Sequence, residues 1–234
     1  MPYNVEVVYR WNQGDVSSDD MRKNLVPPRE SQVEPFLEMI EKVWMDTYTA
    51  EVGQQTLRSY IPKQLLLVGS ASYNDDGSTT EGTAEGGRQI VLYSVNDFNF
   101  ELEQIQSYAH VMHHEFAHIL HQNVEYDAEF EKITPSYSSS WMQMNDETAR
   151  SKGFITAYAF SSADEDFAEM VSIMLTNSPE DWDNMIENAG NAAAVEALRK
   201  KEAIVVAYMK NNWGVNMKDF QKEVVAAIEA AVRN

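Results

Sequence analysis

The chain has 234 residues, 44% of them apolar, and is long enough to bury a substantial core. Its 37 acidic and 18 basic residues give a formal net charge of −19, which would repel a phosphate backbone and argues against nucleic acid as a partner. The absence of cysteine excludes disulfide frameworks, cysteine-based zinc sites and thiol catalysis.

The first predicted elements are a strand and a helix. Residues 3–11, YNVEVVYRW, alternate and are rich in β-branched and aromatic side chains, which predicts a strand. Apolar residues then recur at three- and four-residue spacing, which predicts a helix with one buried face that ends at about Gly53. Because proline is tolerated only in a first turn, Pro35 places the start of this helix between Ser31 and Glu34.

Two further strands are expected over 63–70 (KQLLLVGS) and 88–95 (RQIVLYSV). The segment between them, 69–88, contains five of the ten glycines and reads as a long hairpin connection. It would be either a solvated linker or a lid over an active site.

The next predicted helix carries all five histidines. After capping residues at 96–99 it should run to about Gln122, and the histidines lie within 110–121, HVMHHEFAHILH. At about 100° per residue the apolar side chains share one arc, and four histidines fall nearly opposite to it: His110, His114, His118 and His121. This helix should bury its apolar side and present a histidine stripe to a cleft.

After an irregular stretch over 123–153, a second helix of interest should begin near Ser161 or Ser162, with acidic residues at its positive end. Glu165 and Glu169 are four residues apart and share the side of this helix that is opposite its apolar arc. Three more helices are expected over 179–188, 192–212 and 217–232.

The histidine cluster contains the HExxH pattern of zinc hydrolases, His114-Glu115-Phe116-Ala117-His118. His114 and His118 would bind Zn²⁺, which normally takes three protein ligands and a water. Glu115 points about 100° away from His114 and cannot easily bind the same ion. It would act as the general base that takes a proton from the zinc-bound water and returns it to the leaving nitrogen.

The third ligand has several candidates. On a straight helix His121 lies about 10 Å along the axis from His114, too far to share an ion, so we interpret His121, His110 and His113 as surrounding or surface histidines. A carboxylate from the second helix is favoured. Either Glu165 or Glu169 could bind zinc while the other accepts a hydrogen bond from the far nitrogen of a ligating histidine.

The segment YAFSSADEDFAE, residues 158–169, together with HEFAH, resembles the lethal-factor type of gluzincin. In that group a tyrosine precedes the zinc-binding glutamate by seven residues and a second glutamate follows it by four. The resemblance implies Glu165 as the third ligand and Glu169 as the hydrogen-bond partner of a histidine. It also implies that the hydroxyl of Tyr158 stabilises the oxyanion.

More closely, HHEFAHILHQ with the downstream EDFAE resembles bacterial zinc metallohydrolase lipoproteins associated with outer-membrane substrate import. The similarity extends from the YNVEVVYRW strand through KNLVPP to the C-terminal helices. It implies an exported, lipid-anchored protein at the outer membrane or cell surface, beside a nutrient import system. The lipidated cysteine would precede Met1, since this sequence contains neither a cysteine nor a signal peptide.

We therefore predict one zincin-like α+β domain over 1–234, with a small N-terminal sheet and its backing helix in a part of about 1–125 and a helical part of about 126–234. A strand near 88–95 would edge the cleft and hold an extended peptide by main-chain hydrogen bonds. The expected activity is zinc-dependent hydrolysis of peptide bonds in a peptide or protein substrate. Two alternatives stay open: a zinc hydrolase of another amide, and a non-catalytic zinc-binding surface module that aids nutrient capture.

Overall fold

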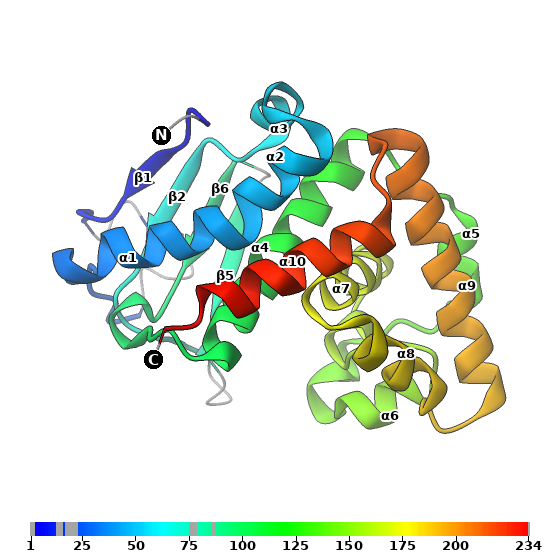
Figure 1. Cartoon of the computed structure of the whole chain (residues 1–234). Helices are drawn as coiled ribbons and strands as arrows, with labels where there is room; N and C mark the ends of the chain where they lie inside the picture. Colours follow the sequence, from blue (N-terminus) through cyan, green and yellow to red (C-terminus); the bar gives the residue numbers. More distant parts are fainter. Residues whose placement is uncertain (1–2, 13–15, 17–22, 75–78, 86–87, 234) are drawn as a thin grey trace.

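A computed structural model describes residues 3–12, 16, 23–74, 79–85 and 88–233. The fold is α+β, as predicted, with a small sheet and many helices. In Figure 1 the sheet and helices α1–α3 form one side of the molecule, helices α5–α9 form the other, and α4 and α10 run between them. The site described below lies where these two sides meet.

The sheet has the strand order β1-β2-β6-β5, with β1 (Glu6–Val8), β2 (Gln64–Leu67) and β6 (Gln89–Leu92) parallel. β5 (Gly82–Glu85) is antiparallel to β6 and forms one edge. The prediction that a strand near 88–95 edges the cleft is therefore wrong, because β6 lies between β2 and β5. Two short strands, β3 (Ser72–Tyr73) and β4 (Thr79–Thr80), pair separately.

The predicted hairpin between 63–70 and 88–95 is wrong, because β2 and β6 are parallel neighbours. Parallel strands require a crossover, and the glycine-rich segment provides it by forming β3, β4 and β5 before the chain enters β6. The first strand is also shorter than predicted, since only Glu6–Val8 of residues 3–11 pairs with β2.

Both faces of the central strands are buried. Leu65, Leu67 and Ile90 face the main core, whereas the alternate residues face a smaller cluster built with Trp11 and Leu25 of the N-terminal segment. The indole N–H of Trp11 donates to the carbonyl of Leu67 at 2.8 Å. Continuous apolar runs such as LLLV, residues 65–68, are typical of strands that are covered on both sides.

The backing helix is continuous from α1 (Glu30–Ile40) through a π-helical turn at Glu41–Met45 into α2 (Asp46–Val52), and α3 (Gln54–Tyr60) follows. It begins at Glu30, one residue before the predicted range, so that Pro35 lies in the second turn. The helix tolerates this proline at the expense of one backbone hydrogen bond, because Pro35 has no N–H. Its inner face is fully buried.

α4 (Leu102–Asn123) follows a 3₁₀ turn at Val95–Asp97 and starts later than the predicted cap. Asn96 does not cap this helix, because its side-chain oxygen accepts the backbone N–H of Arg29 at 2.7 Å. Asn99 accepts the N–H of Glu101 at 2.9 Å just before the first helical residue.

The helical part contains four longer helices, whose positions match the predictions: α7 (Ala163–Thr176), α8 (Pro179–Glu187), α9 (Ala192–Tyr208) and α10 (Met217–Ala231). Each begins after a polar residue whose side chain accepts a backbone N–H of the first turn: Ser162, Ser178, Asn191 and Asn216. The stretch predicted as irregular also holds two short helices, α5 (Glu129–Ile133) and α6 (Asp146–Arg150), and a 3₁₀ turn at Ser139–Gln143.

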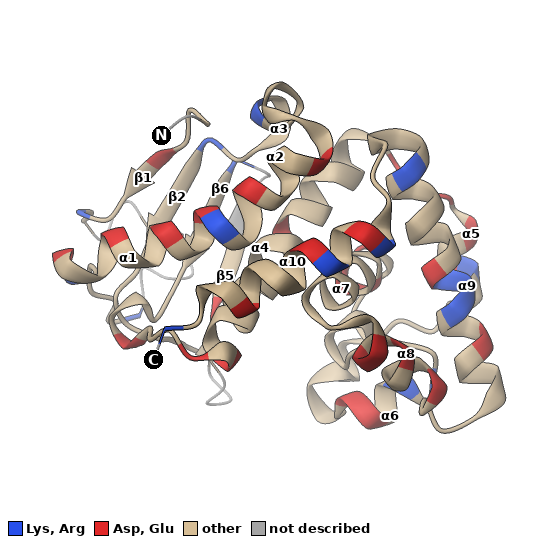
Figure 2. Cartoon of the chain, in the orientation of Figure 1, with Lys and Arg blue, Asp and Glu red and all other residues tan. Residues whose placement is uncertain are grey.

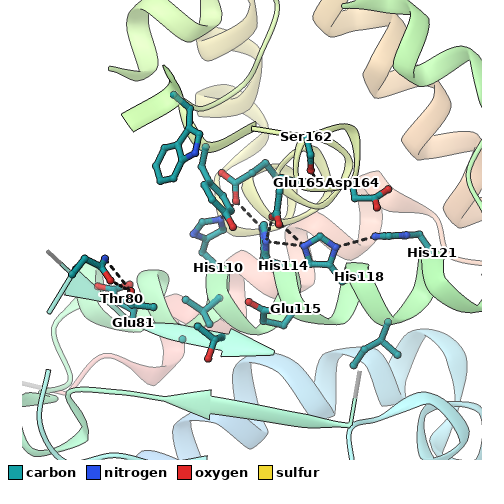
Figure 3. Close-up of a pocket in the computed structure, with 18 of the residues that line it drawn as sticks. Thr80, Glu81, His110, His114, Glu115, His118, His121, Ser162, Asp164 and Glu165 are labelled. Atoms are coloured by element: carbon teal, nitrogen blue, oxygen red, sulfur yellow. Dashed lines mark hydrogen bonds and ion pairs between the residues drawn. The ribbon is translucent and has the colours of Figure 1, made fainter. Parts of the chain in front are cut away.

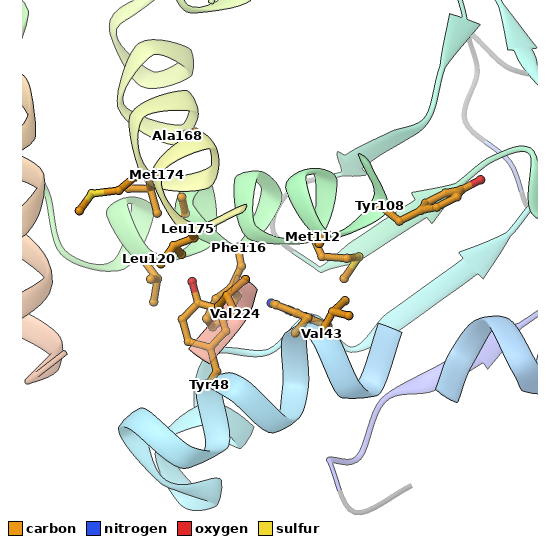
Figure 4. Packing of buried hydrophobic residues seen from close by; sticks show 14 of the residues in the cluster. Val43, Tyr48, Tyr108, Met112, Phe116, Leu120, Ala168, Met174, Leu175 and Val224 are labelled. Carbon is orange, nitrogen blue, oxygen red and sulfur yellow. The ribbon is translucent and has the colours of Figure 1, made fainter. Parts of the chain in front are cut away.

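The buried core extends through both sides of the molecule. Phe116 and Leu120 of α4 pack with Tyr48 of α2 and Val224 of α10, and Met174 and Leu175 of α7 continue the same cluster (Figure 4). Most of the charged residues lie on the helices, and the central strands carry few of them (Figure 2). Among the described residues, no helix combines the length and the hydrophobicity that crossing a bilayer requires.

Candidate metal centre

Three side chains from α4 and α7 meet at one point. His114 and His118 are one helical turn apart on α4, and the first turn of α7 faces them (Figure 3). The Nε2 atoms of the two histidines lie 3.1 Å apart, and Glu165 Oε2 lies 3.0 Å from His114 Nε2 and 3.1 Å from His118 Nε2. Ser162 fixes the start of α7, because its hydroxyl accepts the backbone N–H of Glu165 at 3.2 Å.

This spacing fits a metal ion. In tetrahedral zinc sites, bonds of about 2.0–2.2 Å separate neighbouring ligand atoms by about 3.3–3.6 Å, a few tenths of an ångström more than the three distances observed. A single proton cannot bridge all three contacts, whereas one cation can accept the lone pairs of His114, His118 and Glu165 together. Two nitrogens and one carboxylate oxygen form a donor set of the kind that zinc prefers in hydrolases.

Glu169, one turn after Glu165 on α7, lies behind His114. Its Oε1 is 2.8 Å from Nδ1 of His114 and 2.8 Å from Nε2 of His110, and only 2% of Glu169 is exposed. Burial acts to raise the pKa of Glu169, but the two histidines hold this pKa well below its ordinary value. Glu169 is therefore a buried carboxylate in contact with Nδ1 of His114, the ring nitrogen that does not face Glu165.

The contact between His114 and Glu165 shifts the pKa values of both groups in opposite directions. Burial lowers the pKa of His114, but the contacts with Glu165 and Glu169 outweigh it and raise this pKa to about 10. Burial acts to raise the pKa of Glu165, and the hydrogen bonds from His114 and His118 lower it to about 2.

The remaining histidines have three different surroundings. His121 is buried, and its Nε2 lies 2.9 Å from Nδ1 of His118, the nitrogen that faces away from Glu165. His110 contacts Glu169, as described above. His113 points to the opposite side of α4, where it is fully buried and its Nε2 lies 3.3 Å from the carbonyl of Val43. The interpretation of His113 as a surrounding or surface histidine is therefore wrong, because the helix turns it into the core.

The Nε2 atoms of His114 and His118 and the carboxylate of Glu165 open onto a cleft of about 1160 Å³. Glu115 and Tyr158 line this cleft together with residues of the segment from Thr79 to Thr83, which forms one wall. Burial raises the pKa of Glu115, and the neighbouring His114 offsets part of this effect. The cleft thus contains a carboxyl group that lies beside the histidines of α4 and whose pKa is shifted upward by burial.

Tyr158 comes from a 3₁₀ turn at Tyr158–Phe160, immediately before α7. Its ring lies 5.8 Å from the ring of His114 and 4.9 Å from that of Trp141, and 38% of the residue is exposed. Burial, followed by the charge of Glu165, raises the pKa of the Tyr158 hydroxyl, so this group stays protonated and is a hydrogen-bond donor at neutral pH.

The chain matches the family model of "putative zinc-binding metallo-peptidase" over residues 1–218. It belongs to this family. A crystal structure described as a "putative zinc-binding metallo-peptidase" from Bacteroides caccae is similar over 98% of this chain and 88% of that chain, with 33% identity and a TM-score of 0.82. No curated protein matches. Zinc is accordingly the cofactor of this metallopeptidase family, and the group of His114, His118 and Glu165 fits it.

The sequence prediction brought together the residues that the structure places at the centre, but it missed Thr156. The Thr156 hydroxyl donates to Glu169 Oε2 at 2.6 Å and accepts the N–H of Ala159 at 3.1 Å. No local pattern signals this contact, since Thr156 and Glu169 lie on different elements. The partnership of His121 with His118 could have been inferred from their three-residue spacing on one helix.

Proposed function

We propose that this protein is a zinc-dependent peptidase of the gluzincin type, in which His114, His118 and Glu165 hold the metal. The observation that carries the proposal is the convergence of these three side chains within 3.1 Å of one another, on the wall of a large cleft. Glu115 and Tyr158 line the same cleft, so the groups that such hydrolysis requires occur together.

The chemistry assigns a role to each group. A bound zinc ion supplies a Lewis acid that acidifies water and polarises a carbonyl. Glu115 takes the proton of the attacking water and returns it to the leaving nitrogen, and its raised pKa suits both steps. Tyr158 donates a hydrogen bond to the carbonyl oxygen as negative charge develops on it. Glu169 keeps the His114 ring in place.

A free sheet edge beside the cleft supports a peptide as the substrate. In the described part of the sheet β5 is the outermost strand and pairs only with β6, so no described strand pairs with its other edge. β5 runs close to α4: a Cβ placed on Gly82 would lie 2.3 Å from a methyl group of Val111. An extended peptide that paired with β5 would thus run alongside the helix that carries the HExxH residues.

Metal analysis followed by digestion of a peptide library tests this proposal. We expect one zinc ion per chain and cleavage by the native protein, and Glu115→Gln should keep the zinc while losing about 10²-fold or more in turnover. Glu103→Gln, the same change at an exposed position of α4, serves as the control and should remain active. Zinc binding without cleavage by the native protein would rule out the peptidase. Zinc-dependent release of another amide, or capture of a ligand without turnover, would then identify one of the two alternatives.

The ligand assignment has a separate test. Glu165→Ala should lose bound zinc, because it removes a ligand, whereas Glu169→Ala should retain the ion with lower affinity. The opposite pattern would exchange the roles of the two glutamates. Equilibrium dialysis against graded zinc concentrations measures both.

We also propose that the protein is exported and anchored by lipid at the outer membrane, beside a nutrient import system. The resemblance of HHEFAHILHQ and EDFAE to import-associated lipoproteins supports this. Fractionation of cells that express the gene with its native upstream sequence tests it, and recovery in the cytoplasmic fraction would contradict it.

A further inference from the structure

Glu169 is held by more than the two histidines. Its Oε1 faces His110 and His114, and its Oε2 accepts the hydroxyl of Thr156 at 2.6 Å, the shortest of these contacts. Both residues are buried: 9% of Thr156 and 2% of Glu169 is exposed. The hydrogen bond between Thr156 and Glu169 is itself buried, so a carboxylate oxygen that lost this donor would be costly in this place.

The Thr156 hydroxyl has a fully determined hydrogen-bond arrangement. It accepts the backbone N–H of Ala159 at 3.1 Å and donates its only proton to Glu169. Ala159 is the middle residue of the 3₁₀ turn at Tyr158–Phe160, the turn that carries Tyr158 into the cleft. One hydroxyl thus joins the carboxylate behind His114 to the turn that presents the cleft-lining tyrosine.

We infer that Thr156 is a positioning residue of the metal centre: through Glu169 it fixes the ring of His114, and through Ala159 it fixes the turn of Tyr158. The inference rests on the proposed function, in which His114 binds the metal. Thr156 does not line the cleft, and its hydroxyl bonds to none of the three proposed metal ligands. It therefore acts through its hydrogen bonds with Glu169 and Ala159.

Matched substitutions separate this role from ordinary packing. Thr156→Val keeps the shape of the side chain and removes both hydrogen bonds, whereas Thr156→Ser keeps the hydroxyl. Thr47→Val is the control, because Thr47 is equally buried and its hydroxyl donates only to main-chain carbonyls, including that of Trp44 at 2.8 Å. Thr47 lies on α2, away from the cleft.

The measurement is the zinc dissociation constant of each folded variant, obtained by competition with a chromophoric chelator, together with the visible spectrum of the cobalt-substituted protein. We expect Thr156→Val to weaken zinc binding by about 10- to 100-fold and to alter the cobalt spectrum. Thr156→Ser and Thr47→Val should stay within about threefold of the native protein. If Thr156→Val does not fold, Thr156→Ala takes its place with the same expectation.

Three results would overturn the inference: native zinc affinity in Thr156→Val, an equal loss in Thr47→Val, or an equal loss in Thr156→Ser. Because zinc affinity is measured without a substrate, the test is independent of peptidase activity. A protein that binds zinc but cleaves no peptide would refute the proposed function and leave the role of Thr156 intact.

Discussion

At the scale of single residues, neighbouring histidines on α4 differ because the helix turns each one into a different environment. His114 points to Glu165 and the cleft, while His113, the preceding residue, is fully enclosed beside Val43. Burial raises the cost of a charged imidazole, and this effect outweighs the hydrogen bond to the Val43 carbonyl and lowers the pKa of His113. Two adjacent histidines therefore differ in environment: His113 packs in the core, and His114 faces the cleft.

The burial of His113 predicts a specific pH dependence of stability. Burial lowers the pKa of His113 to about 3, against an ordinary value of about 6.5. Between these values the unfolded chain binds a proton that the folded chain does not, so stability is lost as the pH falls below 6.5, by about 1.4 kcal/mol per pH unit. His113→Gln removes this component. From pH 7 to pH 5 the native protein should lose about 2 kcal/mol more than the variant in urea unfolding, and parallel losses would contradict this.

His121 offers a second residue-scale prediction. The Nδ1 of His118 lies 2.9 Å from His121 Nε2, so His121 can accept the N–H of His118 and leave the other nitrogen free to bind zinc. His121→Leu should lower zinc affinity by about 10-fold, and His121→Gln, which keeps an acceptor, should lower it less. Chelator competition on both variants measures the difference. Equal affinities of His121→Leu and the native protein would show that this contact does not orient His118.

At the scale of elements, a buried ion pair joins α9 to the start of α7. Lys201 Nζ lies 2.6 Å from Oδ2 of Asp166 and also donates to the carbonyl of Gly153 at 2.7 Å, and neither charged side chain is exposed. Tyr137 donates to the same carboxylate oxygen at 3.0 Å. Because Asp166 follows Glu165 directly, this pair ties the turn that carries Glu165 to α9.

Breaking this pair should be costly. Lys201→Met leaves the Asp166 carboxylate buried without its cation, and we expect the free energy of unfolding to fall by about 3–5 kcal/mol. Adding Asp166→Asn to this variant removes the uncompensated charge and should recover part of the loss. Urea unfolding of the two variants checks both statements. A double variant less stable than Lys201→Met would show that the uncompensated charge is not the cause.

At the scale of the whole molecule, three segments far apart in the chain meet at Gly69, after the end of β2. Its N–H donates to the carbonyl of Val26 at 2.8 Å, and its carbonyl accepts the N–H of Asn96 at 3.0 Å. A Cβ here would lie 2.5 Å from the Pro27 carbonyl oxygen and 2.8 Å from Pro28 Cα. Both are backbone atoms, which cannot rotate away as a side chain could.

Gly69→Ala should therefore destabilise the fold by about 1–3 kcal/mol, because the N-terminal segment has to move off the sheet. Thermal unfolding measures the effect. Ser59→Ala, on the exposed side of α3, is a suitable control and should stay within about 0.5 kcal/mol of the native protein. A variant as stable as the native chain would show that the segment around Pro27 is held only loosely.

The sequence by itself determined the features that depend on neighbours along one helix. The four-residue spacings of His114 to His118 and of Glu165 to Glu169 put each pair on one face, because helix geometry is local. Capping is local too, so the start of α7 could be predicted to within one residue, at Ser161 or Ser162. The family and its metal could be predicted for the same reason, since the recognisable motifs are short and continuous.

Only the tertiary structure decided the relations between elements. The parallel pairing of β2 with β6 depends on where the glycine-rich crossover leads, and no periodicity within either strand encodes the partner. The contact of Thr156 with Glu169 likewise depends on how the segment before α7 folds back onto that helix. The histidine pair is thus a property of one helix, whereas the completed metal centre is a property of the packing of α4 against α7.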